Sequence, residues 1–462
     1  MKINNGLFLQ VYTFVTLVAC GLVQYLTGVG SVLWLPFVAA FAMVLLLLMQ
    51  TNYEAVKLDN IETVLTLLLV GAYTLILAST VLQNGLTVTI VGWKNELALS
   101  LIFLCLLLGF IRESQLYRVV QMLYWIFYLQ FPVILYQILV VVPQRVALKG
   151  EFEKWDSVVG TFGGDPMGGG NTAALGLFCL LVMLLKLSEF RHGVVSRLNM
   201  ILHIVAAFIL CVLGEVKFVI LLAPILLIFV WLCPSYVYGV RQKDIKKVLL
   251  MVCTMGLLVL LAIVVLAASY ATAFDTDPDH SALKVFWDSL EYIYDSNYIL
   301  PTGELGRMTT LFFWLDNSQL YGWSNVWFGY GLNATNHGSS VAPGFLNQIF
   351  NVLLDSTSLS MMLWEFGVVG LVLFLCPILL ALKVSMPKEV LKRELLSMQD
   401  IQLLSWQPAF IAFSFAGLLS LPYSQILMLV PMLQFLFYFS LGGSLIIRKT
   451  VIQSGQGYEF FT

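Results

Sequence analysis

The sequence is poor in charged residues. Asp, Glu, Lys and Arg make up only 11% of its 462 residues, whereas 60% are apolar, and the mean hydropathy is +0.91. Because soluble domains carry about 25% charged residues, this chain lacks the charge to cover a water-exposed surface. Its net charge of −2 also excludes the strongly basic surface that nucleic-acid binding requires. The sequence therefore predicts a polytopic membrane protein with no nucleic-acid partner.

Metal ligands in a usable spacing are also missing. The seven cysteines are odd in number and lie in or beside apolar runs, which is typical of small buried residues and not of a disulfide framework. His280 and His337 lie far apart in the chain without ligand spacing. We therefore expect no metal and no other cofactor. The first apolar run follows Lys2 without a small-residue cleavage site, which favours a retained span over a signal peptide.

Long apolar runs are abundant. A helix that crosses a membrane needs about 20 apolar residues, and the sequence contains twelve runs near that length, at 7–27, 31–49, 61–82, 96–111, 117–142, 168–186, 198–213, 216–233, 248–269, 358–382, 403–420 and 423–446. The sequence thus predicts an all-α polytopic membrane protein that forms one integral-membrane domain over residues 1–462, with about twelve transmembrane helices.

The distribution of Lys and Arg predicts the orientation. With the N-terminus in the cytoplasm, only seven of the 24 basic residues fall outside, namely Lys94, Arg145, Lys149, Lys154, Lys217, Lys284 and Arg307. Because basic residues favour cytoplasmic loops, we expect both termini inside, residues 383–402 in the cytoplasm, and residues 143–167 and 270–357 in extracytoplasmic loops. These two outer loops are the longest connections, so function is expected on the outer face.

The larger outer loop interleaves aromatic residues with glycine and asparagine. Aromatic rings stack on the C–H faces of sugars while amides bond their hydroxyl groups. Trp314 and Trp327 are accordingly candidate saccharide-binding residues. The alternative interpretation is an aromatic belt that anchors the loop at the membrane interface.

Arg307 is the only basic residue between positions 303 and 338. Its planar guanidinium matches phosphate oxygens, so an anion-binding role is one interpretation and a surface ion pair with Glu304 is the other. Lys217 and Arg145 are outer cations that would converge on the same anion.

Residues 160–171, "GTFGGDPMGGGN", are rich in glycine. Glycine lets the backbone approach a bulky ligand closely, and a helix that begins near Gly168 would favour phosphate. Asp165 and Asn171 are therefore candidate substrate-binding residues. The alternative is a flexible connector, and a nucleotide-binding P-loop is excluded because the motif's lysine is missing.

Four stretches together resemble the O-antigen polymerase and ligase superfamily of integral-membrane glycosyltransferases. They are "GTFGGDPMGGGN" with Asn171 at its end, "GEVKF" with its basic residue after a span turn, "GRMTTLFFW" followed by "WFGYG", and "LWEFGVVGLVLF" at residues 363–374. The similarity covers about residues 155–382 in these motifs, and the flanking regions by hydropathy alone. Each motif is weak by itself, and their order and spacing strengthen the case.

The resemblance implies a GT-C-like, metal-independent polymerase of oligosaccharide repeat units. Such an enzyme would act on the outer face of a bacterial inner membrane and make a surface, capsular or exopolysaccharide. Its substrate partner would be an undecaprenyl-diphosphate-linked saccharide, with membrane lipid around it and a flippase and a chain-length regulator as further partners. Arg307 would stabilise the leaving diphosphate, assisted by Lys217 and Arg145. The base candidates are Asp355, Glu215, Asp165 and His337, and the sequence does not choose among them.

Two departures from the family pattern leave alternatives open. Ligases carry a histidine about nine residues before the position of Glu365, and this chain has Ser356 there, beside Asp355. Lys217 stands where an arginine is common. A ligase that transfers polymer to another acceptor is the first alternative. A lipid-saccharide transporter is the second, although transporters place ionisable residues at the membrane midplane and show paired halves.

Overall fold

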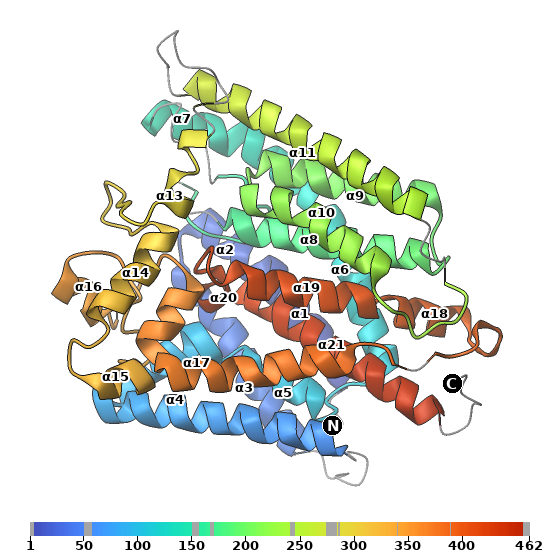
Figure 1. The fold of residues 1–462 in the computed structure, drawn as a ribbon, viewed down its shortest axis with the longest axis horizontal. Helices are drawn as coiled ribbons and strands as arrows, with labels where there is room; N and C mark the ends of the chain where they lie inside the picture. The colour runs from blue at the N-terminus through green and yellow to red at the C-terminus, as the bar shows by residue number, and fades with distance from the viewer. Residues whose placement is uncertain are drawn as a thin grey trace.

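The computed structural model describes residues 4–49, 58–149, 157–166, 171–240, 245–273, 284, 287–339, 341–388 and 390–455. The fold is 76% helical, and the described residues contain isolated β-bridges but no strand (Figure 1). The helices are α1 (Asn5–Phe14), α2 (Cys20–Thr27), α3 (Trp34–Leu48), α4 (Asn60–Gly92), α5 (Ser100–Leu107), α6 (Glu113–Tyr136), α7 (Val142–Lys149), α8 (Thr172–Arg191), α9 (Arg197–Leu213), α10 (Lys217–Leu232), α11 (Ile245–Ala273), α13 (Glu291–Tyr294), α14 (Arg307–Asn317), α15 (Trp323–Phe328), α16 (Phe345–Phe350), α17 (Ser358–Ser385), α18 (Met398–Ser405), α19 (Gln407–Ser420), α20 (Ile426–Leu429) and α21 (Pro431–Gly455).

Within the described ranges, eight helical stretches are long and apolar enough to cross a membrane. They are Asn5–Thr27, Gly30–Leu48, Asn60–Leu97, Glu113–Leu148, Thr172–Arg191, Ser358–Ser385, Met398–Ser420 and Pro431–Ile452. Three shorter apolar helices are Arg197–Leu213, Lys217–Leu232 and Val252–Ala268. The predicted class, a polytopic helical membrane protein, is thereby confirmed. The count of twelve spans stays a prediction.

The predicted span at 96–111 does not form one continuous helix. Its residues are divided between the π-helical turn η4 (Trp93–Leu97) and the eight-residue helix α5. At 1.5 Å per residue, α5 is about 12 Å long and too short to cross a bilayer by itself. The preceding helix α4 is also interrupted, at Gly85, whose φ of 78° and ψ of 174° are not helical. Hydropathy does not register such interruptions, because the residues on either side remain apolar.

The centre of the bundle is formed by α8, α19 and α21, which lie between α4 and α11 in Figure 1. In the most apolar stretch of α8, 94% of the residues are buried, whereas in that of Gly30–Leu48 only 17% are buried. A helix that is apolar on all sides suits either protein or lipid surroundings, so tertiary packing decides which helices lie inside. From Ala174 to Glu189 the residues of α8 are consequently surrounded by protein.

Residues 287–357 lie at one end of the bundle, which we call the loop side. Here α13, α14, α15 and α16 gather, and the start of α1 and the end of α21 lie away from them (Figure 1). The loop side has its own apolar cluster of Leu305, Trp314, Val326, Tyr330, Ala334, Leu346, Leu354 and Trp364. Because Trp364 belongs to α17, the cluster ties the loops to a helix of the bundle.

A second interruption, in α17, anchors the loop side through its backbone. Gly367 has φ 66° and ψ −177°, and the preceding carbonyls of Trp364 and Glu365 accept hydrogen bonds from the Tyr330 N–H (2.7 Å) and the Gly331 N–H (3.0 Å). Backbone polar groups that are buried must find partners within the protein. The break in the helix therefore provides the acceptors that fix the loop.

Gly367→Ala should destabilise the protein. A Cβ at position 367 would lie 2.4 Å from the Gly329 nitrogen, and the positive φ disfavours any side chain. A strained backbone position of this kind costs on the order of 1–3 kcal/mol, so the melting temperature of the purified protein in detergent should fall. Gly256→Ala is the matched control, because a Cβ there meets nothing within 4 Å. Equal melting temperatures for the two variants would contradict this account of the anchor.

The orientation predicted from the charge bias is testable at two exposed positions. Ser324 lies on the loop side in α15, and Gln399 lies in α18 near the opposite end. A cysteine at Ser324 should react with a membrane-impermeant thiol reagent in intact cells, and one at Gln399 should react only after permeabilisation. The unsubstituted protein is the control, because Cys253 and Cys376 are exposed in the helices. The reverse pattern would overturn the predicted orientation.

Candidate functional site

A cavity of about 750 Å³ lies where the loop side meets the helix bundle. Its wall comes from segments far apart in the sequence. They contribute Gln24, Leu33, Gly164, Asp165, Asn171, Thr172, Ala173, Glu215, Val216, Lys217, Tyr292, Glu304, Arg307, Tyr423, Ser424, Gln425, Ile426, Leu429, Val430 and Pro431. We call it the main cavity. It combines polar groups with an apolar side that α20 and the start of α21 supply.

Four helices begin at the wall of the main cavity. They are α8 at Thr172, α10 at Lys217, α14 at Arg307 and α21 at Pro431. In α8, α10 and α14 the N-cap residue (Asn171, Val216 and Gly306, respectively) forms no side-chain capping hydrogen bond. The first N–H groups of a helix lack intrahelical acceptors, and the helix dipole adds partial positive charge at the same end. Converging helix starts therefore favour an anion in the cavity.

Two of these helices carry a cation as their first residue. Lys217 opens α10, with Nζ 3.0 Å from the Ser289 hydroxyl, and Arg307 opens α14. A cation at a helix N-terminus opposes the dipole and is unfavourable unless an anion lies nearby. Glu304 supplies one such charge beside Arg307, and a bound anion would supply another.

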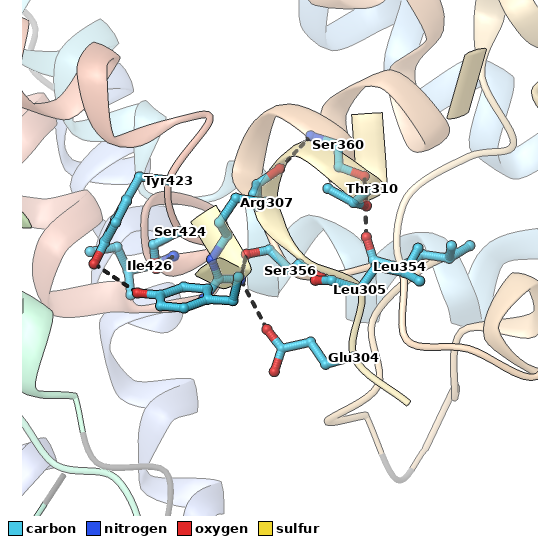
Figure 2. Close-up of polar contacts among 12 residues, drawn as sticks. Glu304, Leu305, Arg307, Thr310, Leu354, Ser356, Ser360, Tyr423, Ser424 and Ile426 are labelled. Atoms are coloured by element: carbon cyan, nitrogen blue, oxygen red, sulfur yellow. Dashed lines mark hydrogen bonds and ion pairs between the residues drawn. The ribbon is translucent and has the colours of Figure 1, made fainter. Parts of the chain in front are cut away.

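Arg307 is held by one nitrogen of its guanidinium. Nη1 donates to Glu304 Oε1 at 2.9 Å and to the carbonyl oxygen of Ser356 (Figure 2). The guanidinium carbon lies 5.3 Å from the centre of the Tyr292 ring. Nε is buried and has no hydrogen-bond partner among the described residues. The head group is therefore oriented while part of its donor set stays unused.

The segment before Arg307 is rigidly placed. Leu300 N–H donates to the Glu304 carbonyl at 2.8 Å, and Ile299 pairs with Leu305 as an antiparallel bridge. Gly306 fits closely, since a Cβ there would lie 2.9 Å from the Tyr292 carbonyl oxygen. This local fold fixes both members of the Glu304–Arg307 pair at the cavity wall.

Five residues predicted from the sequence line the main cavity together: Arg307, Glu215, Lys217, Asp165 and Asn171. Glu215 adopts a left-handed conformation, with φ 54°, in the turn between α9 and α10. The Asn171 amide donates to the Phe162 carbonyl at 2.8 Å and so fixes the start of α8. The described part of the glycine-rich segment, the α9–α10 turn and the start of α14 therefore form one site.

Arg145, Trp314 and Trp327 do not line the main cavity. Arg145 is buried on α7 and donates through Nη1 to the Ser157 hydroxyl at 2.9 Å, behind the glycine-rich segment. Trp314 is 8% exposed in the loop-side apolar cluster, and Trp327 is 48% exposed on α15. Packing accounts for the burial of Trp314, which leaves little ring face for a sugar.

Asp355 and His337 do not line the main cavity. Asp355 is buried and accepts a hydrogen bond from the His337 backbone N–H at 3.1 Å. Burial raises the pKa of Asp355 to about 6, and the negative charge of Glu304 adds to the shift, while the bond from His337 opposes it. His337 lines a second cavity of about 420 Å³ with neighbours that include Thr302, Gly303 and Asn347.

The main cavity also contains residues that the sequence did not single out, namely Gln24, Tyr292, Tyr423 and Gln425. The hydroxyl groups of Tyr292 and Tyr423 lie 3.2 Å apart and bridge two sides of the cavity. Gln24 accepts a hydrogen bond from the Gly164 N–H at 3.1 Å. In the sequence, the signal that could have identified Gln24 was a polar side chain within the first apolar run.

The fold and the main cavity define a polytopic helical membrane protein with a polar, cation-bearing site at one end of its bundle. No protein-family model matches the chain, and no curated protein matches it. Among the described residues, no group of three or more His, Cys, Asp or Glu side chains is placed to hold a metal ion.

Asp355 should make stability depend on pH. Its pKa of about 6 in the folded protein exceeds its ordinary value of 3.8, so the folded state holds a proton that the unfolded chain releases. Stability is then lost as pH rises from about 4 to about 6, by about 3 kcal/mol in total. Asp355→Asn should flatten this part of the melting-temperature profile and raise the melting temperature at pH 7. An unchanged slope in the variant would rule out Asp355 as its source.

Proposed function

We propose that this protein is a glycosyltransferase that polymerises lipid-diphosphate-linked oligosaccharide repeat units on the outer face of a bacterial cytoplasmic membrane. The observation that carries the proposal is the convergence of Lys217, Arg307 and several helix starts on one cavity. A diphosphate has several charged oxygens within a short length, and separate cations and helix starts can share them.

The apolar side of the main cavity supports a lipid-linked donor. Leu33, Ile426 and Leu429 line this side, so a prenyl chain would leave the diphosphate along apolar residues and continue into the surrounding lipid. The polar residues of the cavity would then face the saccharide. A soluble anion without a lipid tail would leave the apolar side of the cavity without a contact.

The reaction asks little covalent chemistry of the protein. The acceptor hydroxyl attacks the anomeric carbon, the bond to the diphosphate oxygen breaks, and the hydroxyl proton passes to a base. Negative charge grows on the departing diphosphate, where fixed cations stabilise it most. Lys217 and Arg307 take this role in the proposal. Asp165, Glu215 and Glu304 line the same cavity and are the carboxylates within reach of the acceptor side.

Polymerase is preferred over ligase because of Ser356. At this position the hydroxyl donates to the Leu305 carbonyl at 2.7 Å and the carbonyl accepts from Arg307. Both groups serve to hold the Arg307 segment, and serine does not supply the histidine base of the ligases that the sequence resembles.

Arg307→Ala should lower the rate of polymer formation by about 100- to 1,000-fold, the usual effect of removing one donor to a developing negative charge. Arg307→Lys should recover part of this loss, because an ammonium group keeps the charge but not the planar fork. The assay uses purified enzyme at matched concentration, lipid-diphosphate repeat units, and gels that resolve product length.

Lys284→Ala is the matched control, since Lys284 is an exposed cation in the outer loop that does not line the main cavity. Wild-type polymer length and rate from Arg307→Ala would refute the role of Arg307. Transfer of saccharide to an added acceptor without chain growth would replace polymerase by ligase.

A further inference from the structure

Two glutamates outside the main cavity are buried against each other. Glu96 lies in η4 and Glu365 in α17, and each is 1% exposed. Their carboxyl groups lie close enough to interact electrostatically, and both accept hydrogen bonds from residues 333–335. No salt bridge reaches either group among the described residues. Lys94, close to Glu96 in sequence, instead donates to the Asn95 amide oxygen at 2.8 Å and lies over the Trp34 ring.

One oxygen of each carboxyl group is already used. Glu96 Oε1 accepts from the Asn333 N–H at 3.0 Å. Glu365 Oε1 accepts from the Thr335 N–H at 2.9 Å and from the Thr335 hydroxyl at 2.6 Å. The other oxygen of each group, Oε2, is buried and finds no donor among the described protein groups. Two ionised carboxylates would thus leave two buried acceptors without a donor, and two like charges close together.

A single proton resolves this conflict. We propose that Glu96 and Glu365 form a buried site in which the two carboxyl groups share one proton and which, while the proton is bound, holds residues 333–335 on the membrane helices. Glu365 accepts two hydrogen bonds and Glu96 one, so the ionised form is better stabilised on Glu365. The proton therefore resides on Glu96, which donates a hydrogen bond to Glu365. This inference does not rest on the proposed function.

The proton site is connected to the main cavity through short contacts. The Asn336 amide donates to the Asn333 side chain at 3.0 Å, and the next residue, His337, donates its backbone N–H to Asp355. Asp355 precedes Ser356, whose carbonyl accepts from Arg307. Loss of the proton would leave both Glu96 and Glu365 negatively charged. Their repulsion would loosen residues 333–337, which contact the segment that holds Arg307.

Infrared spectroscopy tests the proposal directly in the unsubstituted protein. At a pH two units above the Asp355 pKa of about 6, the protein should still show the carbonyl stretch of a protonated carboxyl group, shifted by H/D exchange. Glu96→Gln and Glu365→Gln should each abolish this band. Glu113→Gln, at an exposed first residue of α6, should leave it unchanged.

The pH profile of the melting temperature provides a second readout. In the unsubstituted protein the melting temperature should fall at alkaline pH, because the folded state holds a proton that the unfolded chain releases. Glu96→Gln should be flat in that range, since its amide donates to Glu365 without a titrating proton. The absence of a protonated band in the unsubstituted protein would overturn the proposal. So would a band that survives both substitutions, or a melting temperature that rises with added Na⁺ or Ca²⁺ while no band is present, because a metal ion would then occupy the site.

Discussion

The loop side depends on the contact between residues 329–335 and the interruptions in two membrane helices. Gly367 breaks α17, and its freed carbonyls bond the Tyr330 and Gly331 N–H groups. Near the break in α4, the Asn84 amide donates to the Tyr330 carbonyl at 2.8 Å. Because a buried backbone group without a hydrogen-bond partner is costly, these groups have to be satisfied by protein. The loop gains its position from the same bonds that make the broken helices tolerable.

The position of Arg307 follows from that anchor. The loop-side apolar cluster joins Leu305, just before α14, and Trp314, within α14, to Trp364 of α17. Ser356 then reaches Arg307 through its carbonyl. A long, flexible side chain is thereby fixed at a helix start where its charge opposes the dipole. Glu304 offsets part of this unfavourable interaction and a bound anion would offset more, which is the physical reason to regard the cavity as a binding site.

The sequence predicted what composition and local pattern determine. Charge depletion and apolar runs led to the helical membrane class, and isolated polar residues such as Arg307 and Lys217 marked the cavity. The interruptions at Gly85 and Gly367 were not predicted, because a glycine in an apolar run does not reveal its backbone angles. Pairing of Glu96 with Glu365 depends on how η4 and α17 pack. Trp314 was a candidate for saccharide binding, with an interface anchor as the alternative, but aromatic composition does not distinguish either of these from a buried core.

A structure determined by electron cryomicroscopy with a prenyl-diphosphate saccharide bound would test the central claim most directly, since it locates the phosphorus atoms. The account predicts both phosphates in the main cavity, within hydrogen-bond distance of Lys217 Nζ and the Arg307 guanidinium, with the prenyl chain beside Leu429 and Ile426. Phosphates bound elsewhere, with Lys217 still on Ser289 and Arg307 still held only by Glu304 and Ser356, would contradict it.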